Sequence, residues 1–205
     1  MLGQSAKRHC AIGIALFGVA AVLSSFVSSP PSSLCLSRTS RQDEMEPITS
    51  AVPYMSLPGN HEVTCTEVTP FLCPSFQRNF TAYRNRFRMP WRESGGVDNL
   101  WHSFDYGLAH FIQIDTETDY PNSKMGPGTF YNAGPFGNQV GWFEADLQKA
   151  ALMKEKGTIA WIIVSGHRPW YGSGGHCEPC QAAFEALMIQ YGVDVYFSGH
   201  VHCEE

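Results

Sequence analysis

The chain has 205 residues, of which 43% are hydrophobic and 16% charged, and its formal net charge is −5. This balance is typical of a folded globular protein and excludes a chain that is disordered along its whole length. The 14 Lys and Arg residues form no long basic run, so we expect neither nucleic acid nor an anionic membrane surface as an electrostatic partner.

The N-terminal segment 1–27 has the pattern of a targeting signal. Lys7, Arg8 and His9 precede an uncharged apolar stretch over 10–27, and small residues and prolines follow it. This order is typical of a secretory signal peptide, although about 18 apolar residues also reach the lower limit for a membrane anchor. Because Ser and Gly dilute the apolar stretch, we expect a cleaved signal peptide and a secreted protein rather than an uncleaved anchor.

The rest of the chain divides into a short linker and one domain. Residues 28–45 are rich in Ser, Pro and charge, and we assign them to a linker or junction, whereas 46–205 has the composition of a compact domain. Apolar runs of strand length cover 48–57, 110–115, 159–164 and 193–197. Apolar residues at helical spacing occur at Val140, Phe143, Leu147 and Ala150, and again at Phe184, Leu187, Met188 and Tyr191. Alternating strands and helices predict an α/β layered fold, and the Gly-, Pro- and Asn-rich segment 120–138 predicts a long loop.

Cysteine usage agrees with export. In an oxidising compartment Cys65 and Cys73 are candidates for a disulfide that closes a small loop. The CxxC of Cys177 and Cys180 allows a redox-active or a zinc-binding role, but a structural or incidental role is favoured because the sequence has no second CxxC. The sequon that begins at Asn79 makes this residue a candidate for N-glycosylation.

Three polar clusters follow predicted strands, and each opens with glycine: GNHE at 59–62, GHRP at 166–169 and GHVH at 199–202. Ligand sites of open α/β sheets gather beyond the carboxyl ends of the strands, so we expect these loops to converge. Glycine lets the backbone turn sharply, imidazole suits zinc and iron, and an Asn carbonyl adds a neutral oxygen ligand. The pattern predicts a metal site, in which the two histidines of GHVH lie on one face of an extended segment and can address two neighbouring ions.

The order of these motifs resembles the last three of five motifs of the calcineurin-like metallophosphoesterases. The segments 46–62, 78–90 and 103–120 are similar to purple acid phosphatases, particularly those of fungal type, and the resemblance extends over 46–202. It implies an α/β, metallophosphoesterase-type layered sandwich with mixed β-sheets flanked by helices. It also implies hydrolysis of small phosphoric monoesters by a binuclear centre of Fe(III) with Zn(II), Fe(II) or Mn(II).

The resemblance also implies a metal-ligand set. Asn60, His167 and His200 match the ligands of the divalent ion, and His202 matches a ligand of the ferric ion.

Other histidines receive different roles from the same resemblance. His61 matches the residue that contacts phosphate and helps to protonate the leaving group, and His176 falls at a position that often faces the substrate. His102 and His110 match no catalytic position, so we expect a structural role for both.

The sequence departs from the family pattern upstream. The first two family motifs supply a terminal Asp, a bridging Asp and the Tyr that colours the ferric ion. Residues 1–45 contain one Asp, Asp43, and no Tyr. We therefore expect an incomplete sandwich whose divalent site keeps three ligands, enough for a single zinc. The alternatives to a working phosphatase are a non-catalytic secreted metal-binding or interaction protein, and a truncated gene model of an active parent.

Overall fold

The computed structural model describes residues 15–16, 19–21, 44–64, 73–123, 133–172 and 176–201. These residues belong to two compact units, one that reaches Ser56 and one that covers Leu57–Val201. No helix within the described ranges combines the length and the apolar character that crossing a membrane requires.

The first unit contains a helical segment at 44–49 and a small three-stranded sheet. Its strands are β1 (Ala15–Leu16), β2 (Val19–Ala21) and β3 (Tyr54–Met55); β1 pairs antiparallel with β2, and β2 pairs parallel with β3. The long strand predicted over 48–57 is wrong, because only two of its residues are extended. Acidic residues at the start of the segment favour a helix N-terminus, and Pro53 has no N–H to donate to a strand partner.

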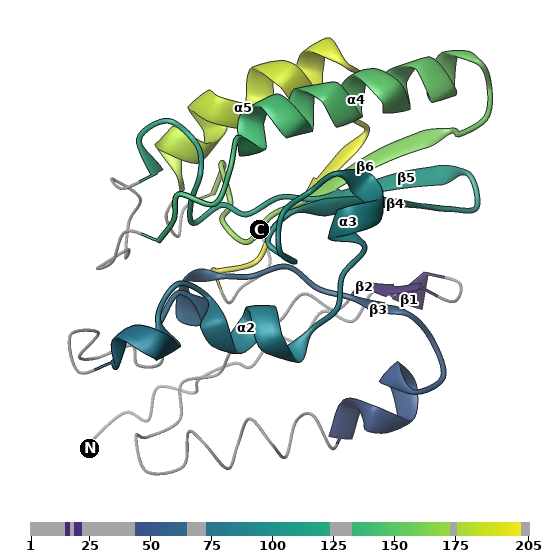
Figure 1. Cartoon of the computed structure of the whole chain (residues 1–205). Coiled ribbons are helices and arrows are strands. Elements are labelled where there is room, and N and C mark those ends of the chain that lie inside the picture. Colours follow the sequence, from purple (N-terminus) through teal and green to yellow (C-terminus); the bar gives the residue numbers. More distant parts are fainter. Residues whose placement is uncertain are drawn as a thin grey trace, which may run out of the picture. The chain divides into compact units, whose positions relative to one another are not determined.

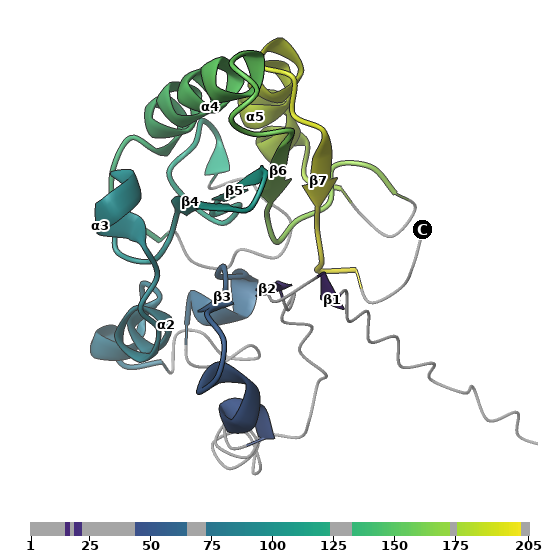
Figure 2. The ribbon, with the colours of Figure 1, turned by 90° about the vertical axis from the view of Figure 1, so that its right-hand side faces the viewer.

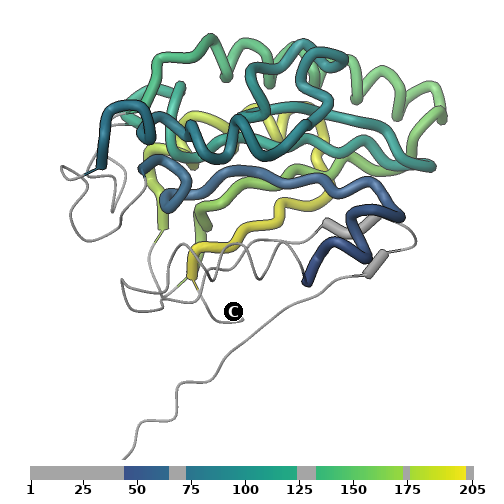
Figure 3. The backbone as a smooth tube through the Cα atoms, turned by 60° about the horizontal axis from the view of Figure 1, so that its bottom comes forward, coloured from purple at the N-terminus to yellow at the C-terminus, as the bar shows by residue number. Residues whose placement is uncertain are grey.

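The second unit is built around a four-stranded sheet in the order β4-β5-β6-β7. Its strands are β4 (His102–Tyr106), β5 (Ala109–Gln113), β6 (Trp161–Ser165) and β7 (Val195–Phe197). β4 and β5 form an antiparallel hairpin, whereas β5, β6 and β7 are parallel (Figure 1). In Figure 3 the green tube of β6 runs beside the yellow tube of β7. The three strands predicted at 110–115, 159–164 and 193–197 are confirmed, with ends that shift by at most two residues.

Two long helices cover one face of this sheet (Figures 1 and 2). They are α4 (Gln139–Glu155) and α5 (Glu178–Gln190), and both coincide with the predicted helical patterns. The core between helices and sheet includes the fully buried side chains of Ile112, Ile162, Phe143, Leu147 and Phe184. Because parallel strands need a long connection, each helix carries the chain from one strand to the next and covers the core as it does so. The mixed α/β class is confirmed.

Short elements precede the sheet and form a smaller core. They are η1 (Asn60–Glu62), η3 (Ser75–Gln77), α2 (Thr81–Arg86) and α3 (Trp91–Ser94). Val63, Phe80, Tyr83, Leu100 and Trp101 make up this second cluster of buried side chains.

The predicted loop at 120–138 has neither α-helix nor strand in its described parts, 120–123 and 133–138. It ends at Asn138, whose side chain accepts a hydrogen bond from the Gly141 N–H at 3.0 Å and so caps α4. Gln139, the next residue, is fully buried and holds the chain after β5. Its Oε1 accepts the Asp115 N–H at 2.7 Å, and its Nε2 donates to the Thr118 carbonyl at 2.9 Å.

Candidate metal centre

The GNHE loop is a tight turn in which the first residue, Gly59, and the last, Glu62, are hydrogen-bonded to each other. The Glu62 carboxylate accepts the Gly59 N–H at 2.9 Å, and the Glu62 N–H donates to the Gly59 carbonyl at 3.1 Å. Glu62 therefore shapes the loop. A β-carbon added at Gly59 would lie 2.8–2.9 Å from the His167 ring, so only glycine allows this ring to pack against the loop.

The two histidine loops continue the parallel pairing of β6 and β7. The Gly166 N–H donates to the Phe197 carbonyl, and the Gly199 N–H donates to the His167 carbonyl, both at 3.0 Å. His200 then adopts a left-handed backbone conformation, with φ of 67°. Non-glycine residues seldom adopt this conformation, and when they do they often belong to functional sites.

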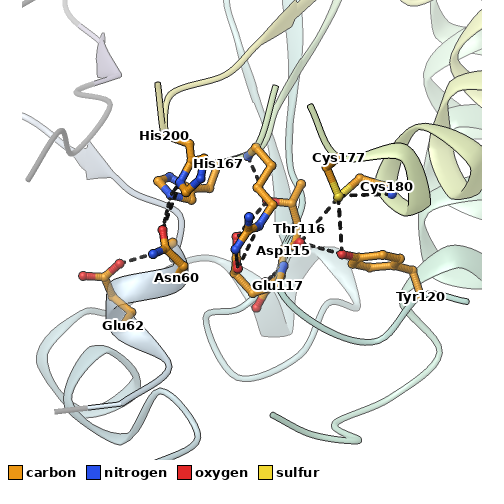
Figure 4. A network of polar contacts seen from close by, with 12 residues as sticks. Asn60, Glu62, Asp115, Thr116, Glu117, Tyr120, His167, Cys177, Cys180 and His200 are labelled. Carbon is orange, nitrogen blue, oxygen red and sulfur yellow. Dashed lines mark hydrogen bonds and ion pairs between the residues drawn. A yellow bond between two sulfur atoms is a disulfide. The ribbon is translucent and has the colours of Figure 1, made fainter. Parts of the chain in front are cut away.

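Three atoms that are able to coordinate a metal ion, one from each of these loops, lie close together (Figure 4). Asn60 Oδ1 lies 2.7 Å from His167 Nε2 and 3.1 Å from His200 Nδ1, and the two nitrogens lie 3.0 Å apart. Asn60 is separated from His200 by 140 residues in the sequence. The predicted convergence of Asn60, His167 and His200 is therefore what the structure contains.

The three contacts cannot all be hydrogen bonds at once. An amide oxygen only accepts, and each imidazole nitrogen carries at most one proton. A proton on one nitrogen leaves the other nitrogen's lone pair facing the Asn60 oxygen, whereas protons on both nitrogens make two donors face each other. A single cation, by contrast, would accept a lone pair from every one of the three atoms.

The donor set fits a divalent ion in chemistry and nearly in spacing. Ligand atoms around tetrahedral zinc, with bonds of about 2.0–2.1 Å, lie about 3.3–3.4 Å apart. The observed separations of 2.7–3.1 Å need to widen by only a few tenths of an ångström. Two imidazoles and one amide oxygen suit zinc or iron(II) and leave room for exogenous ligands.

Comparison with known proteins agrees with this arrangement. The sequence profile of the calcineurin-like phosphoesterases matches residues 35–204. The chain belongs to this family. The acid phosphatase of Aspergillus ficuum is 38% identical over 80% of this chain, and acid phosphatase A of Cryphonectria parasitica is 41% identical over 78%. Purple acid phosphatase 23 of Arabidopsis thaliana is 34% identical over 78% of the chain. The resemblance inferred from the motifs is confirmed.

These relatives are much longer than the chain. The alignments cover 35%, 37% and 31% of the Aspergillus, Cryphonectria and Arabidopsis proteins. The chain thus spans about a third of the length of the curated relatives that it matches.

Other predicted site residues of this calcineurin-like phosphoesterase lie in different surroundings. His61 follows Asn60 in η1 and is half-buried. His176 is exposed just before α5, with its Nε2 3.2 Å from the Glu178 carboxylate. His202 lies outside the described residues, so its role as a ligand stays a prediction. Among the residues that the structure does describe, no group of three or more His, Cys, Asp or Glu side chains could hold an ion.

The predicted modification sites have mixed outcomes. Cys177 and Cys180 form a disulfide with a Cα–Cα distance of 5.3 Å, and both are buried, which supports the structural role favoured for the CxxC. Cys73 is disulfide-bonded, but Cys65 lies outside the described residues, so their pairing stays a prediction. Asn79 is exposed in a turn before α2, where a glycan has space, and its glycosylation stays a prediction.

Sequence reasoning missed a buried polar network behind His167. After β5 the chain runs through Asp115, Thr116 and Glu117 (Figure 4), and all three are fully or almost fully buried. Glu117 pairs with the equally buried Arg168. Burial raises the pKa of Asp115 well above its ordinary value, and the neighbouring Glu117 charge raises it further. The alternating D-T-E-T-D directly after an apolar strand was the available signal, because charged residues seldom follow a buried strand without partners.

Proposed function

We propose that this chain contributes to an acid phosphatase that hydrolyses small phosphoric monoesters at a metal centre. The observation that carries the proposal is the meeting of Asn60 Oδ1, His167 Nε2 and His200 Nδ1 within 2.7–3.1 Å of one another. Family membership and the acid phosphatase names of relatives in fungi and plants support it. A net charge of −5 fits a small-molecule substrate better than a nucleic acid.

Each residue has a defined part in this proposal. Asn60, His167 and His200 hold a divalent ion, and His202 contributes to a neighbouring ferric site. Bound ions of this kind polarise a phosphoryl oxygen and stabilise the charge that develops on both oxygens of an in-line displacement. His61, directly after the ligand Asn60, contacts the phosphate and gives a proton to the leaving alcohol. His176, which is exposed just before α5, faces the rest of the substrate.

The metals proposed are Fe(III) with Zn(II), Fe(II) or Mn(II) for the whole binuclear centre, and a single zinc for this chain. Two imidazoles with one amide oxygen carry no net charge, which suits a divalent ion better than a ferric one.

We further propose that the protein is secreted and glycosylated at Asn79. A Cys177–Cys180 disulfide and a disulfide-bonded Cys73 support an oxidising compartment, because such bonds are rare where glutathione keeps thiols reduced. The basic and apolar pattern of 1–27 supports entry by a signal peptide.

A chimera tests the enzymatic proposal. Residues 46–205 are joined behind the upstream part of the Aspergillus ficuum acid phosphatase, and hydrolysis of p-nitrophenyl phosphate is measured with iron and zinc present. We expect metal-dependent turnover that falls at least about 100-fold in His167→Ala, because removal of a ligand removes charge stabilisation. An active chimera that is indifferent to His167→Ala would contradict the assigned site.

One observation favours a second candidate, a secreted protein that binds metal without turnover. Within the described ranges no carboxylate joins the Asn60 cluster to make a three-member His, Cys, Asp or Glu group. A chimera that binds zinc but hydrolyses no phosphoester would favour this candidate.

A further inference from the structure

A charged pair is buried directly behind the ligand loop of His167. Arg168 Nε donates to the two Glu117 carboxylate oxygens at 2.8 and 3.0 Å, and Nη2 donates to Oε2 at 2.6 Å. The side chains are 1% and 0% exposed. A buried ion pair is a weak source of stability, because desolvation of two charges offsets their attraction. A contribution to stability therefore does not explain why the pair is present. The pair is better explained by the backbone geometry that it fixes next to His167.

The pair belongs to a clamp on the backbone that carries His167. The Arg168 N–H donates to the Thr116 hydroxyl at 3.0 Å, and the Tyr196 hydroxyl donates to the Arg168 carbonyl at 2.8 Å. With the guanidinium held by Glu117, the N–H, the carbonyl and the side chain of Arg168 are all fixed. Thr116 and Glu117 follow β5, Arg168 follows β6 and Tyr196 lies in β7, so the clamp joins the three parallel strands.

The side chains of Tyr196 and Thr116 pack closely against the backbone of Gly166. A β-carbon at Gly166 would lie 2.5 Å from the Tyr196 hydroxyl oxygen and 2.8 Å from the Thr116 methyl group. The two residues that flank His167 are therefore packed and hydrogen-bonded, which fixes the backbone from which the ring reaches Asn60 and His200.

We propose that Arg168, Glu117, Thr116 and Tyr196, here called the His167 clamp, are positioning residues that set the place of His167 Nε2 in the metal site. This inference rests on the proposed function, because it concerns residues that hold a ligand of the proposed metal site in place. The clamp acts through the backbone of His167, and since the Arg168–Glu117 pair is neutral overall, its effect on the ion is geometric. Residues that orient metal ligands typically change metal affinity by about 10- to 100-fold when they are replaced.

Two hydroxyl deletions and one double replacement test the clamp in the full chain. Tyr196→Phe and Thr116→Val each remove one hydroxyl with little change of shape. Arg168→Met with Glu117→Leu removes both charges together, a change that buried ion pairs often tolerate without loss of stability. Zinc affinity is measured by competition with a chromophoric chelator, and stability by urea unfolding.

We expect about 10- to 100-fold weaker zinc binding in the double variant, with an unfolding midpoint close to that of the parent, and a smaller loss in each hydroxyl variant. Tyr191→Phe is the matched control, because its hydroxyl lies 3.4 Å from the exposed Glu144 carboxylate on the helices. A folded double variant with parental zinc affinity would overturn the clamp, because stabilisation would then be the pair's only role.

A metal-free measurement separates this inference from the proposed function. In the zinc-free chain, hydrogen exchange is measured at the Arg168 and Gly199 amides, together with the ring ¹⁵N shifts of His167. We expect faster exchange at both amides and shifted ring signals in the clamp variants. If the parent binds no zinc but these changes occur, the metal site fails and the clamp stands. Unchanged exchange and ring signals overturn the clamp whatever the parent binds.

Discussion

Single histidines of this chain differ in role because their surroundings differ. His167 and His200 bring ring nitrogens to a shared point, whereas His110 lies between two carboxylates and His102 is fully buried and stacked on Phe104. The sequence distinguished these two groups, because only the proposed ligands His167 and His200 follow glycine at a strand end. The sequence could not predict which ring nitrogen faces the cluster. This atom is Nε2 in His167 and Nδ1 in His200, where the backbone is left-handed.

Gly59→Ala should disturb the metal site without unfolding the protein. Its β-carbon would lie 2.8–2.9 Å from the His167 ring, so the ring must move away from Asn60 and His200. We expect zinc affinity to fall about 10-fold or more, while the free energy of unfolding falls by only about 1–3 kcal/mol, the usual cost of one extra carbon at a buried position. Gly199→Ala is the control, because there the nearest His167 atoms lie 3.9–4.0 Å away.

His102→Phe should stabilise the fold. His102 is fully buried, neither ring nitrogen has a hydrogen-bond partner in the described part of the chain, and burial lowers its pKa to about 3. Phe replaces the unsatisfied nitrogens with carbon and keeps the stack on Phe104, so we expect a gain of about 1–3 kcal/mol in the free energy of unfolding.

The gain from His102→Phe should grow as the pH falls. The unfolded chain takes up a proton near pH 6.5 but the folded chain only near pH 3, so the parent loses stability through this window and the variant does not. Urea unfolding at pH 7 and pH 4.5 measures both effects. A variant less stable than the parent at both values would show that His102 has a partner of its own.

At the scale of elements, the strands and helices that could be predicted were those with a clear pattern of apolar residues. Apolar runs gave β5, β6 and β7, and helical spacing gave α4 and α5, because these elements bury continuous faces against one another. β4 was missed, since its sequence HSFDY is mostly polar and it is a strand only through its pairing with β5. The turn at Gly107, with φ of 59°, makes that pairing possible.

The β4–β5 hairpin is tied to α4 by a histidine that titrates. His110 Nδ1 lies 2.6 Å from Asp105 on β4, and its Nε2 lies 3.0 Å from Asp146 on α4. Burial alone would lower the pKa of His110, but the hydrogen bonds and charges of Asp146 and Asp105 outweigh it and raise the pKa above 6.5. The stabilisation is therefore fully present below pH 6.5 and is lost as the pH rises through the folded-state value.

This contact predicts how stability depends on pH. We expect the free energy of unfolding to decrease from pH 6 to pH 9, and we expect His110→Gln to remove most of this slope while lowering stability by about 1–3 kcal/mol at pH 6, because hydrogen bonds to charged groups are lost. Urea unfolding at intervals of half a pH unit measures it. A slope that survives His110→Gln would assign the effect to another group.

At the scale of the whole molecule, the site is a product of topology. Asn60, His167 and His200 are distant in sequence, and sheet order and loop closure bring them together. The motif order predicted this meeting. A shared edge of the parallel sheet explains it for His167 and His200, which follow β6 and β7, but not for Asn60, because β3 belongs to the other sheet. The ion pair behind it could not be predicted, since the D-T-E-T-D run signals buried charges but does not show that Glu117 pairs with Arg168, 51 residues away.

The 205-residue chain by itself should bind one zinc and turn over poorly. The three proposed ligands, Asn60, His167 and His200, suffice for one divalent ion, whereas the proposed binuclear mechanism needs two ions about 3.5–4 Å apart. Refolded with iron and zinc, the chain should therefore bind at most about one zinc equivalent, show no purple absorption and hydrolyse p-nitrophenyl phosphate near the background rate. Metal content by mass spectrometry, visible absorption and initial rates measure these outcomes.

Matched variants locate the ion. His200→Ala should abolish zinc binding, because two remaining ligands do not hold it, whereas His176→Ala should leave it unchanged, since His176 contacts the exposed Glu178. His202→Ala should also retain the zinc, because the family match assigns His202 to the ferric ion. In the chimera, by contrast, His202→Ala should remove iron and activity together. Robust hydrolysis by the unmodified chain would prove the assignment wrong, since a carboxylate other than those expected would then complete the centre.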